Sequence, residues 1–290
     1  MGKNNTEFKV DKNIELMKFL MEKMPQNSRN SIKSMLIHKR VMVGEEVVSQ
    51  YNYMLKEGQV VSIGKSRVHK QDLKGVTILY EDNDILVVEK DKGILSVATA
   101  KEKDNTAYSI LKNYLKEVDP KNKIFVVHRL DRDTSGVMLF AKTPKAQDIL
   151  QTNWNEMVKE RTYVALVEGA MEKETDTIVS YIAENKAYVS YSTTNENEGK
   201  KAVSTYKVLK KNKNYSLVEV NIETGRKNQI RVHMQDIGHS VVGDKKYGAT
   251  KNPIKRLGLH AHSIVFVHPI TKEVFSFTSK IPNEFLSLFR

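Results

Sequence analysis

A polar stretch between two apolar runs holds the residues of this 290-residue chain that are best suited to chemistry. Residues 128–136 read His-Arg-Leu-Asp-Arg-Asp-Thr-Ser-Gly, so an imidazole, two guanidinium groups and two carboxylates lie close together. The apolar runs at 124–127 and 137–141 predict two buried strands around this stretch. Charged loops are usually only solvated, but loops held between rigid strands are also where catalytic groups tend to lie. The stretch is therefore a candidate active-site loop.

A second dense motif, Thr-Gly-Arg-Lys-Asn-Gln-Ile-Arg-Val-His-Met, occupies residues 224–234. It lacks the glycine and lysine spacing of a phosphate-binding loop, and we expect Gly225 to end a strand before a helix begins near Ile230. Residues 161–167 alternate as a strand that carries Tyr163, which is typical of a half-buried core position. Helices predicted at 106–118 and 145–157 flank the candidate loop along the chain.

Charge and composition narrow the class of protein. The formal net charge is +12, which favours a polyanionic partner because binding to phosphates releases counterions. The chain has no cysteine, so disulfides and thiolate sites are excluded and we expect a cytoplasmic location. No apolar run approaches the roughly 20 residues of a membrane helix, and no apolar stretch follows the N-terminus as in a signal peptide. The sequence thus predicts a nucleic-acid partner and no membrane association.

The motifs, in this order, resemble the RluA-type RNA pseudouridine synthases. The loop matches the family signature His-Arg-Leu-Asp-x-x-Thr-Ser-Gly, and residues 78–93 match the family's opening segment with Asp91 in place of Pro. Residues 161–169 match Lys-x-Tyr-x-Ala-x-Val-x-Gly with Arg161 for Lys. The second motif matches Thr-Gly-Arg-x-His-Gln-Ile-Arg-x-His, but Asn228 replaces its first His. Asn donates hydrogen bonds as His does, yet it cannot carry a proton near neutral pH.

The resemblance implies an α+β fold with a mixed, mainly antiparallel central sheet flanked by helices over residues 76–290. Residues 13–65 are similar to the small α/β S4 RNA-binding module, through Leu-x-x-Phe-Leu, Ser-Arg-x-x-Ile-Lys, Lys-Arg-Val-x-Val-Gly and Leu-x-x-Gly-x-x-Val. Residues 1–12 are expected to form a flexible N-terminus and 66–75 a basic linker.

Four cations of the S4-like segment are candidate RNA-binding residues. Arg29 and Lys33 are four residues apart and share one helix face, with Lys39 and Arg40 following. A basic helix face is typical of phosphate binding, although a solvated face is the common alternative. We expect these side chains to contact the RNA backbone.

The resemblance also implies roles for the loop and the second motif, with no cofactor and no metal. Asp131 would be the nucleophile or charge-stabilising carboxylate, since Asp133 falls at a variable position of the signature. Arg231 would pair with Asp131, Tyr163 would pack against the target base, and Arg129 would fill the gap left by the extruded uridine. Attack at C1′, attack at C6 and removal of a C2′ proton all remain open for Asp131.

The expected substrate is structured RNA, with ribosomal RNA favoured by the S4-like module and transfer RNA left open; the sequence indicates no protein partner. One alternative is a catalytically inactive RNA-binding or ribosome-assembly factor. Another is a metal-dependent nuclease that uses His260, His262 and an Asp. The two histidines share one strand face, but no carboxylate lies near them in sequence. Residues 171–200 predict a hairpin excursion without an assigned function.

Overall fold

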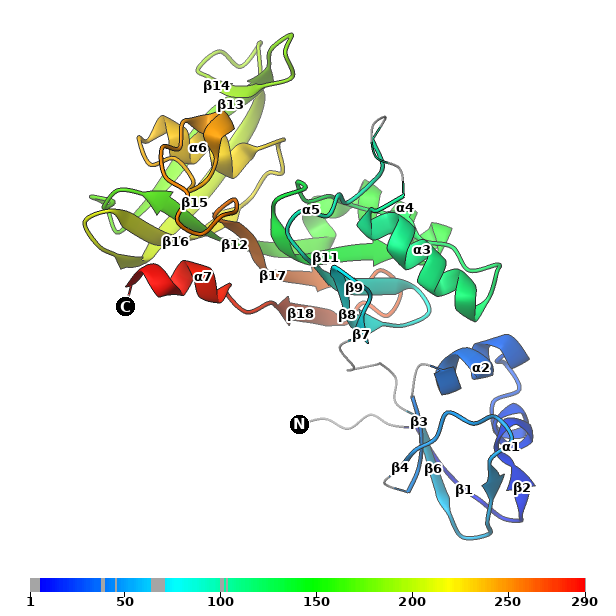
Figure 1. The fold of residues 1–290 in the computed structure, drawn as a ribbon. Coiled ribbons are helices and arrows are strands. Elements are labelled where there is room, and N and C mark those ends of the chain that lie inside the picture. The colour runs from blue at the N-terminus through cyan, green and yellow to red at the C-terminus, as the bar shows by residue number, and fades with distance from the viewer. Residues whose placement is uncertain are drawn as a thin grey trace.

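The computed structural model describes residues 6–37, 40–44, 46–63, 71–99, 102 and 104–289, which form two units along the chain (Figure 1). Apart from a few residues inside the two predicted domains, three expectations fall at least in part outside the described residues. They are the RNA-binding role of Lys39, residues 1–5 of the flexible N-terminus and residues 66–70 of the basic linker.

The N-terminal unit has a hydrophobic core of its own, built by one face of each helix against a small sheet. Phe19, Leu20, Ile32, Leu36 and Val61 are fully buried in that core or nearly so. The second helix begins at Arg29, just after Ser28, whose Oγ accepts from the Ser31 amide at 3.1 Å. The elements are β1 (Thr6–Lys9), β2 (Ile14–Glu15), α1 (Leu16–Lys23), α2 (Arg29–Ile37), β3 (Val41–Val43), β4 (Glu46–Val47), β5 (Met54–Leu55) and β6 (Val60–Ile63), with sheets ordered β1-β6-β3-β4 and β2-β5.

Strand β1 differs from the flexible terminus expected for residues 1–12. Thr6–Lys9 pairs antiparallel with β6 over four residues, from Thr6 opposite Ile63 to Lys9 opposite Val60. The segment is polar except for Phe8, whose ring meets that of Phe19 edge-on at 6.4 Å between centroids. This one aromatic contact and the ladder hydrogen bonds order a segment whose composition alone predicts disorder.

The larger unit is built on one twelve-stranded sheet (Figure 1). The strands run in the order β14-β13-β15-β16-β12-β17-β11-β9-β8-β7, with β10 beside β11 and β18 beside β17. Among the strand pairs of the described residues, β11 with β17 is parallel and the others are antiparallel, as predicted. The elements are β7 (Gln71–Asp72), β8 (Val76–Glu81), β9 (Ile85–Lys90), α3 (Ala107–Val118), β10 (Phe125–Val126), β11 (Ser135–Ala141), α4 (Pro144–Thr152), α5 (Trp154–Met157), β12 (Val158–Glu168), β13 (Thr175–Glu184), β14 (Ser190–Thr193), β15 (Lys200–Lys211), β16 (Tyr215–Ile222), α6 (Gln229–Asp236), η1 (Lys245–Tyr247), β17 (Leu259–Val267), β18 (Val274–Thr278), α7 (Asn283–Leu286) and η2 (Ser287–Phe289).

Strand β11 is buried on both faces, which explains its continuous apolar run. Met138 and Phe140 pack in the core beneath α3, whereas Val137 and Leu139 pack in the core beneath α4 and α5. Because successive side chains of a strand point to opposite faces, the two sets of helices cover opposite sides of the sheet. Packing on both faces fixes the position of β11, and the candidate loop lies directly before its first residue.

The helix predicted over 145–157 is interrupted at Asn153, where α4 ends and α5 begins. At the other end of the sheet, α6 packs on β12 and β16 through Ile230 and Met234, and it lies beside β14 far from the N-terminal unit (Figure 1). Across the described residues, no helix is long and apolar enough to cross a membrane.

Candidate active site

The candidate loop is placed by an unusually close approach of two strands. At Gly136 the backbone has φ +118°, and a Cβ there would lie 2.1 Å from the carbonyl oxygen of Ala261. Gly136 pairs with Ala261, and Ala261 pairs in turn with Tyr163 on its other side. Only glycine permits this contact, and the register that it sets brings Tyr163 of β12 beside the loop.

Two buried polar side chains from the neighbouring segment hold the loop backbone. Ser96 Oγ accepts from the Leu130 amide at 3.0 Å and donates to the Leu130 carbonyl at 2.6 Å. The fully buried ammonium of Lys90 donates to the carbonyls of Asp91, Ile94 and Arg132 at 2.9, 2.7 and 3.1 Å.

Burial lowers the pKa of Lys90 to about 8, with the charges of Asp133 and Asp131 opposing the shift. Sequence reasoning did not single out Lys90 or Ser96. The available signal was a lysine at an inward-facing position of the apolar strand β9.

Asp131 faces Arg231 across the loop and helix α6, as expected from the resemblance. Arg231 Nη1 lies 3.3 Å from Asp131 Oδ2, and the two residues are 100 positions apart in the chain. The side chain of Asp131 is 34% exposed and that of Arg231 is 14% exposed. Arg231 therefore orients the carboxylate on one side, and the carboxylate remains accessible to solvent on the other side.

Arg231 is itself fixed from three sides. Its Nε and Nη2 donate to the two oxygens of the buried Asp244 at 2.6 and 2.8 Å, and its Nη1 donates to Asn228 Oδ1 at 2.7 Å. Its guanidinium lies 4.8 Å from the centroid of the Tyr247 ring. Burial alone would lower the pKa of Arg231, but the hydrogen bonds and charge of Asp244 raise it above its ordinary value. Residues 243–248, which read Gly-Asp-Lys-Lys-Tyr-Gly, thus supply the carboxylate and the aromatic ring that hold this arginine.

Asn228 has a defined structural task where the family pattern has His. It begins α6 in the left-handed conformation, with φ 58° and ψ 20°, which Asn tolerates better than most residues. Its Oδ1 accepts from Arg231, and its Nδ2 donates to the Tyr247 hydroxyl at 3.0 Å. The amide of Asn228 links Arg231 to Tyr247 and does not gain or lose a proton near neutral pH.

A cavity of about 410 Å³ opens in front of Asp131, within the range of small-molecule sites. Tyr163 lines it, and burial raises the pKa of this phenol to about 12, so the ring is neutral near pH 7. Arg129 lies exposed at its edge. The lining residues are Arg129, Leu130, Asp131, Thr134, Tyr163, Ile222, Gly225, Arg226, Lys227, Asn228, Gln229, Ile230, Arg231 and Leu259.

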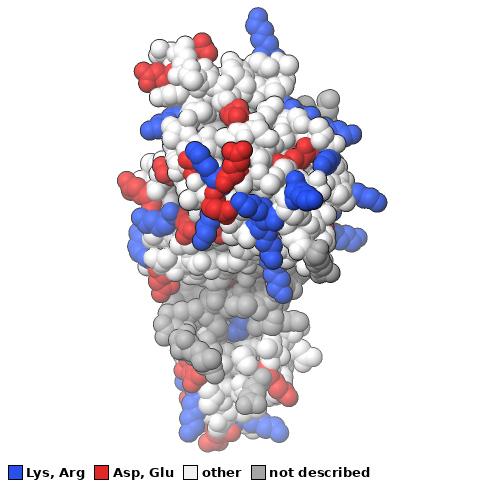
Figure 2. Space-filling view, turned by 90° about the vertical axis from the view of Figure 1, so that its left-hand side faces the viewer, with Lys and Arg blue, Asp and Glu red and all other residues white. Residues whose placement is uncertain are grey.

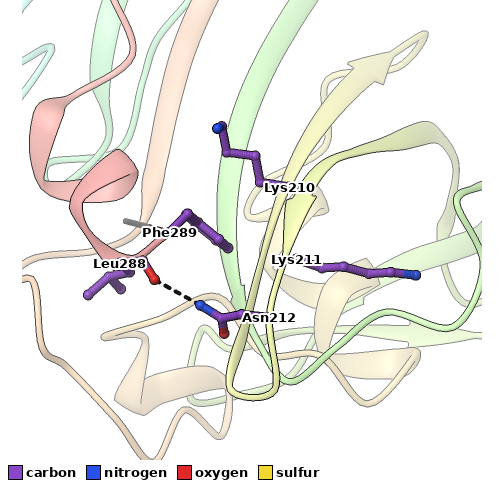
Figure 3. Close-up of a pocket in the computed structure, with 5 residues that line it drawn as sticks. All are labelled: Lys210, Lys211, Asn212, Leu288 and Phe289. Carbon is purple, nitrogen blue, oxygen red and sulfur yellow. Dashed lines mark hydrogen bonds between the residues drawn. The ribbon is translucent and has the colours of Figure 1, made fainter.

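A second cavity of about 350 Å³ lies between the β15–β16 turn and the C-terminal helices (Figure 3). Its lining contains two lysines and the Asn212 amide, which donates to the Leu288 carbonyl at 2.8 Å, but no carboxylate or imidazole. The chemistry that a carboxylate could perform is therefore confined to the first of these two cavities.

Among the other candidates of the loop and of β17, Asp133, His128 and His260 have hydrogen-bond partners. Asp133 accepts from the exposed Arg132 at 3.3 Å and does not line the first cavity. His128 Nε2 accepts from the Leu139 amide at 2.9 Å, and burial lowers the pKa of His128 to about 3. His260 Nδ1 is bonded to Ser135 Oγ at 2.8 Å. In the part of the chain that the structure describes, no group of three His, Asp or Glu side chains could hold a metal.

The candidate RNA-binding cations of the N-terminal unit do not form one group. Arg29 and Lys33 are exposed on α2, as the helix-face argument requires. Arg40 is instead half-buried, and burial lowers its pKa against the opposing charges of Asp82 and Glu81 in the larger unit. Arg40 therefore faces carboxylates of the larger unit.

Comparison of the sequence with known proteins shows the family to which this chain belongs. Residues 84–236 match the family described as RNA pseudouridylate synthase. The chain is 33% identical to an uncharacterized RNA pseudouridine synthase of Aquifex aeolicus (strain VF5), over 98% of this chain and 95% of that one. The chain belongs to the RluA-type family of RNA pseudouridine synthases. It is also 30% identical to the ribosomal large subunit pseudouridine synthase D of Pasteurella multocida (strain Pm70), covering 93% of this synthase and 88% of that protein.

Solved structures agree with the predicted fold class. Human RNA pseudouridylate synthase domain containing 1 superimposes with a TM-score of 0.59 at 25% identity, covering 73% of this chain and 86% of that one. Human RNA pseudouridylate synthase domain containing 4 has a TM-score of 0.60 at 21% identity, covering 72% and 90%. The family match and the relatives make this synthase an isomerase that acts on RNA, as the sequence predicted.

Proposed function

We propose that Asp131 is the catalytic carboxylate with which this synthase converts specific uridines of RNA to pseudouridine. The observation that carries the proposal is the contact of Arg231 Nη1 with Asp131 Oδ2 at 3.3 Å on the wall of the cavity. Arg231 balances the charge of the carboxylate and fixes its orientation, and the bidentate pair with Asp244 keeps the arginine in place. Asp131 is then the exposed reactive group of an otherwise rigid charged cluster.

The isomerisation breaks the C1′–N1 bond, turns the base, forms the C1′–C5 bond and moves the C5 proton to solvent as N1 gains one. A carboxylate serves such a reaction as a nucleophile at C1′ or C6, or as a base at C2′, and all three routes need it ionised and aimed at the sugar or ring. The neutral phenol of Tyr163 offers a face against which the free base packs. Arg129, which is exposed and lines the cavity, would occupy the space left by the extruded uridine.

Ribosomal RNA is the proposed substrate, because several relatives bear the name ribosomal large subunit pseudouridine synthase D. Residues 13–65 are proposed to act as an S4-like domain, with 66–75 as linker and 76–290 as the catalytic domain. Exposed Arg29 and Lys33 of this domain would add phosphate affinity without reading sequence, as would Lys39. For such a substrate we propose a cytoplasmic location.

The test is carbodiimide-based pseudouridine mapping across ribosomal and transfer RNA. Cells lacking the protein are compared with cells that regain the wild type, Asp131→Ala or the matched control Asp133→Ala. We expect specific ribosomal uridines to regain the modification with the wild type and Asp133→Ala, and not with Asp131→Ala. Equal restoration by Asp131→Ala would refute the catalytic assignment, and sites confined to transfer RNA would refute the substrate. If no site changes with the wild type, an RNA-binding factor without catalysis becomes the better hypothesis.

A further inference from the structure

The tip of the β13–β14 hairpin presents an aromatic ring to solvent at an energetic cost. Tyr188 is 75% exposed, and its backbone has a φ of 59° in the left-handed region. A bulky residue in that region is a true outlier, and such strain persists only where the surrounding structure imposes it. Neither the burial of the ring nor the folding of the hairpin explains why this residue is a tyrosine.

The turn that imposes this conformation is built by Asn185. Its Oδ1 accepts from the amides of Ala187 and Val189, both at 3.0 Å, and its carbonyl accepts from the Tyr188 amide at 2.9 Å. A short asparagine-centred turn of this kind holds its backbone firmly. The ring is therefore directed outward by a rigid turn.

Two lysines outside the hairpin, Lys227 and Lys246, contact Tyr188. Lys227 lines the active-site cavity, and its ammonium lies 5.8 Å from the centroid of the Tyr188 ring. Glu184 binds the same ammonium at 2.5 Å, and Lys246 donates to the Tyr188 carbonyl at 3.3 Å. The tyrosine thus lies next to Lys227, one of the residues that line the cavity.

The charge around the tip suits a nucleic-acid chain. Lys186 in the turn and Lys227 and Lys246 beside Tyr188 are all exposed, and Glu184 is the one carboxylate bound to any of them in the described hydrogen bonds. On the side of the molecule turned toward the viewer in Figure 2, Lys and Arg are interspersed with Asp and Glu. An exposed aromatic ring among cations is the usual arrangement for binding single-stranded nucleic acid.

We propose that Tyr188, with Lys227 and Lys246, forms a stacking platform for an unpaired base of the substrate RNA that neighbours the target uridine. The ring stacks on the base, and the two ammonium groups flank its phosphate. The inference rests on the proposed RNA modification and adds a requirement to it, namely that the nucleotide beside the target is unstacked in the complex. The β13–β14 hairpin thereby contributes to the choice of uridine.

The test is fluorescence anisotropy with the full chain carrying Asp131→Ala, which prevents turnover. The probe is a labelled single-stranded oligoadenylate with one central uridine, and a second probe has abasic riboses on both sides of that uridine. Tyr188→Ala is expected to weaken binding of the first probe about 5- to 100-fold, and Tyr188→Phe less than about twofold. Tyr191→Ala is the matched control, since Tyr191 is also exposed, at 42%, on the same hairpin.

The abasic probe is expected to bind wild-type Tyr188 and Tyr188→Ala equally, because the base that stacks is gone. Lys227→Gln should lower the slope of log Kd against log salt by about 0.7, whereas Tyr188→Ala leaves the slope unchanged. Unchanged binding by Tyr188→Ala, an equal loss in Tyr191→Ala, or no binding of the first probe at all would each overturn the platform. A normal melting temperature of Tyr188→Ala excludes misfolding as the cause. Failure of the proposed function is seen separately, as an absence of pseudouridine with the wild type.

Discussion

Two aspartates of the larger unit sit in charged networks that differ in how completely they are satisfied. Asp82, in the β8–β9 turn, accepts at Oδ1 from the amides of Asp84 and Ile85, both at 2.8 Å. Its Oδ2 accepts from the Tyr80 hydroxyl and from His268 Nε2, both at 2.9 Å. Asp131 has one side-chain partner among the described residues, Arg231 at 3.3 Å, and a cavity in front of it.

The difference separates a carboxylate that stabilises the fold from one that can react. The hydrogen bonds to Asp82 lower its pKa despite the opposing effect of burial, and they leave no free lone pair for a substrate. At Asp131 the donors of Arg231 are largely committed to Asp244, so the carboxylate is oriented yet uncapped. The small number of hydrogen-bond donors around Asp131 therefore marks it as a reactive group as much as its charge does.

The largest expected effects separate these two residues. Asp131→Asn should lower kcat at least about 10⁴-fold, because it removes the reactive group, and should leave thermal stability nearly unchanged, because the Asn oxygen can still accept from Arg231. Asp82→Ala should cost about 3 kcal/mol of unfolding free energy, because it leaves buried donors unpaired, and should keep kcat below its melting temperature. Single-turnover kinetics and urea denaturation measure both. An Asp82→Ala enzyme that is stable but inactive would contradict the comparison.

His128 offers a second contrast, since it belongs to the signature loop but serves the fold. Its folded pKa of about 3 lies below the ordinary 6.5, so the unfolded chain binds a proton that the folded protein excludes. The contribution of neutral His128 to the free energy of unfolding is complete above pH 6.5. It decreases as the pH is lowered, by about 2 kcal/mol at pH 5.

Urea denaturation at a series of pH values, with His128→Gln as the reference, measures this loss. The variant keeps an acceptor for the Leu139 amide but has no proton to gain, so its stability curve should be flatter between pH 6.5 and 5. Equal slopes for the two proteins would mean that His128 titrates normally in the folded state.

Asp244 should matter for catalysis although it lies behind the reacting groups. Asp244→Asn removes the charge that holds Arg231 and is expected to lower kcat about 100-fold, with a small change in KM, because the arginine no longer aims Asp131. Asp236, exposed at the end of α6, provides the matched control as Asp236→Asn. A loss confined to KM would indicate a role in RNA binding instead.

The smallest effects are expected at Asn228. Asn228→Gly keeps the left-handed backbone but loses the 2.7 Å bond to Arg231, whereas Asn228→Ala loses both. We expect kcat to fall about threefold for Gly and about tenfold for Ala. Asn228→His restores the residue usual in the family and should stay within about threefold of the wild type. An Asn228→His enzyme with a new ionisation near pH 6.5 in kcat would show that this position can take part in proton transfer.

Local pattern was sufficient for most individual elements. The apolar run of β11, the cap of α2 and the amphipathic α3 follow from periodicity and capping residues that any neighbouring structure would leave intact. It failed where one contact outweighed composition, as when Phe8 ordered β1. Of the site, the resemblance named Asp131, Tyr163 and Arg231, but not Lys90, Ser96 or the task of Asp244.

The sequence by itself determined the family, the mixed sheet and the identity of the candidate carboxylate, because these depend on residue types in a fixed local order. Only the tertiary structure decided which cations serve it. Arg231 reaches Asp131 across 100 residues, and Arg40 faces Asp82 and Glu81. The ring of Tyr188 lies beside Lys227 of the cavity lining, and β14 lies against α6. Such pairings depend on strand register and on burial, and neither is set by a residue's own neighbours in the chain.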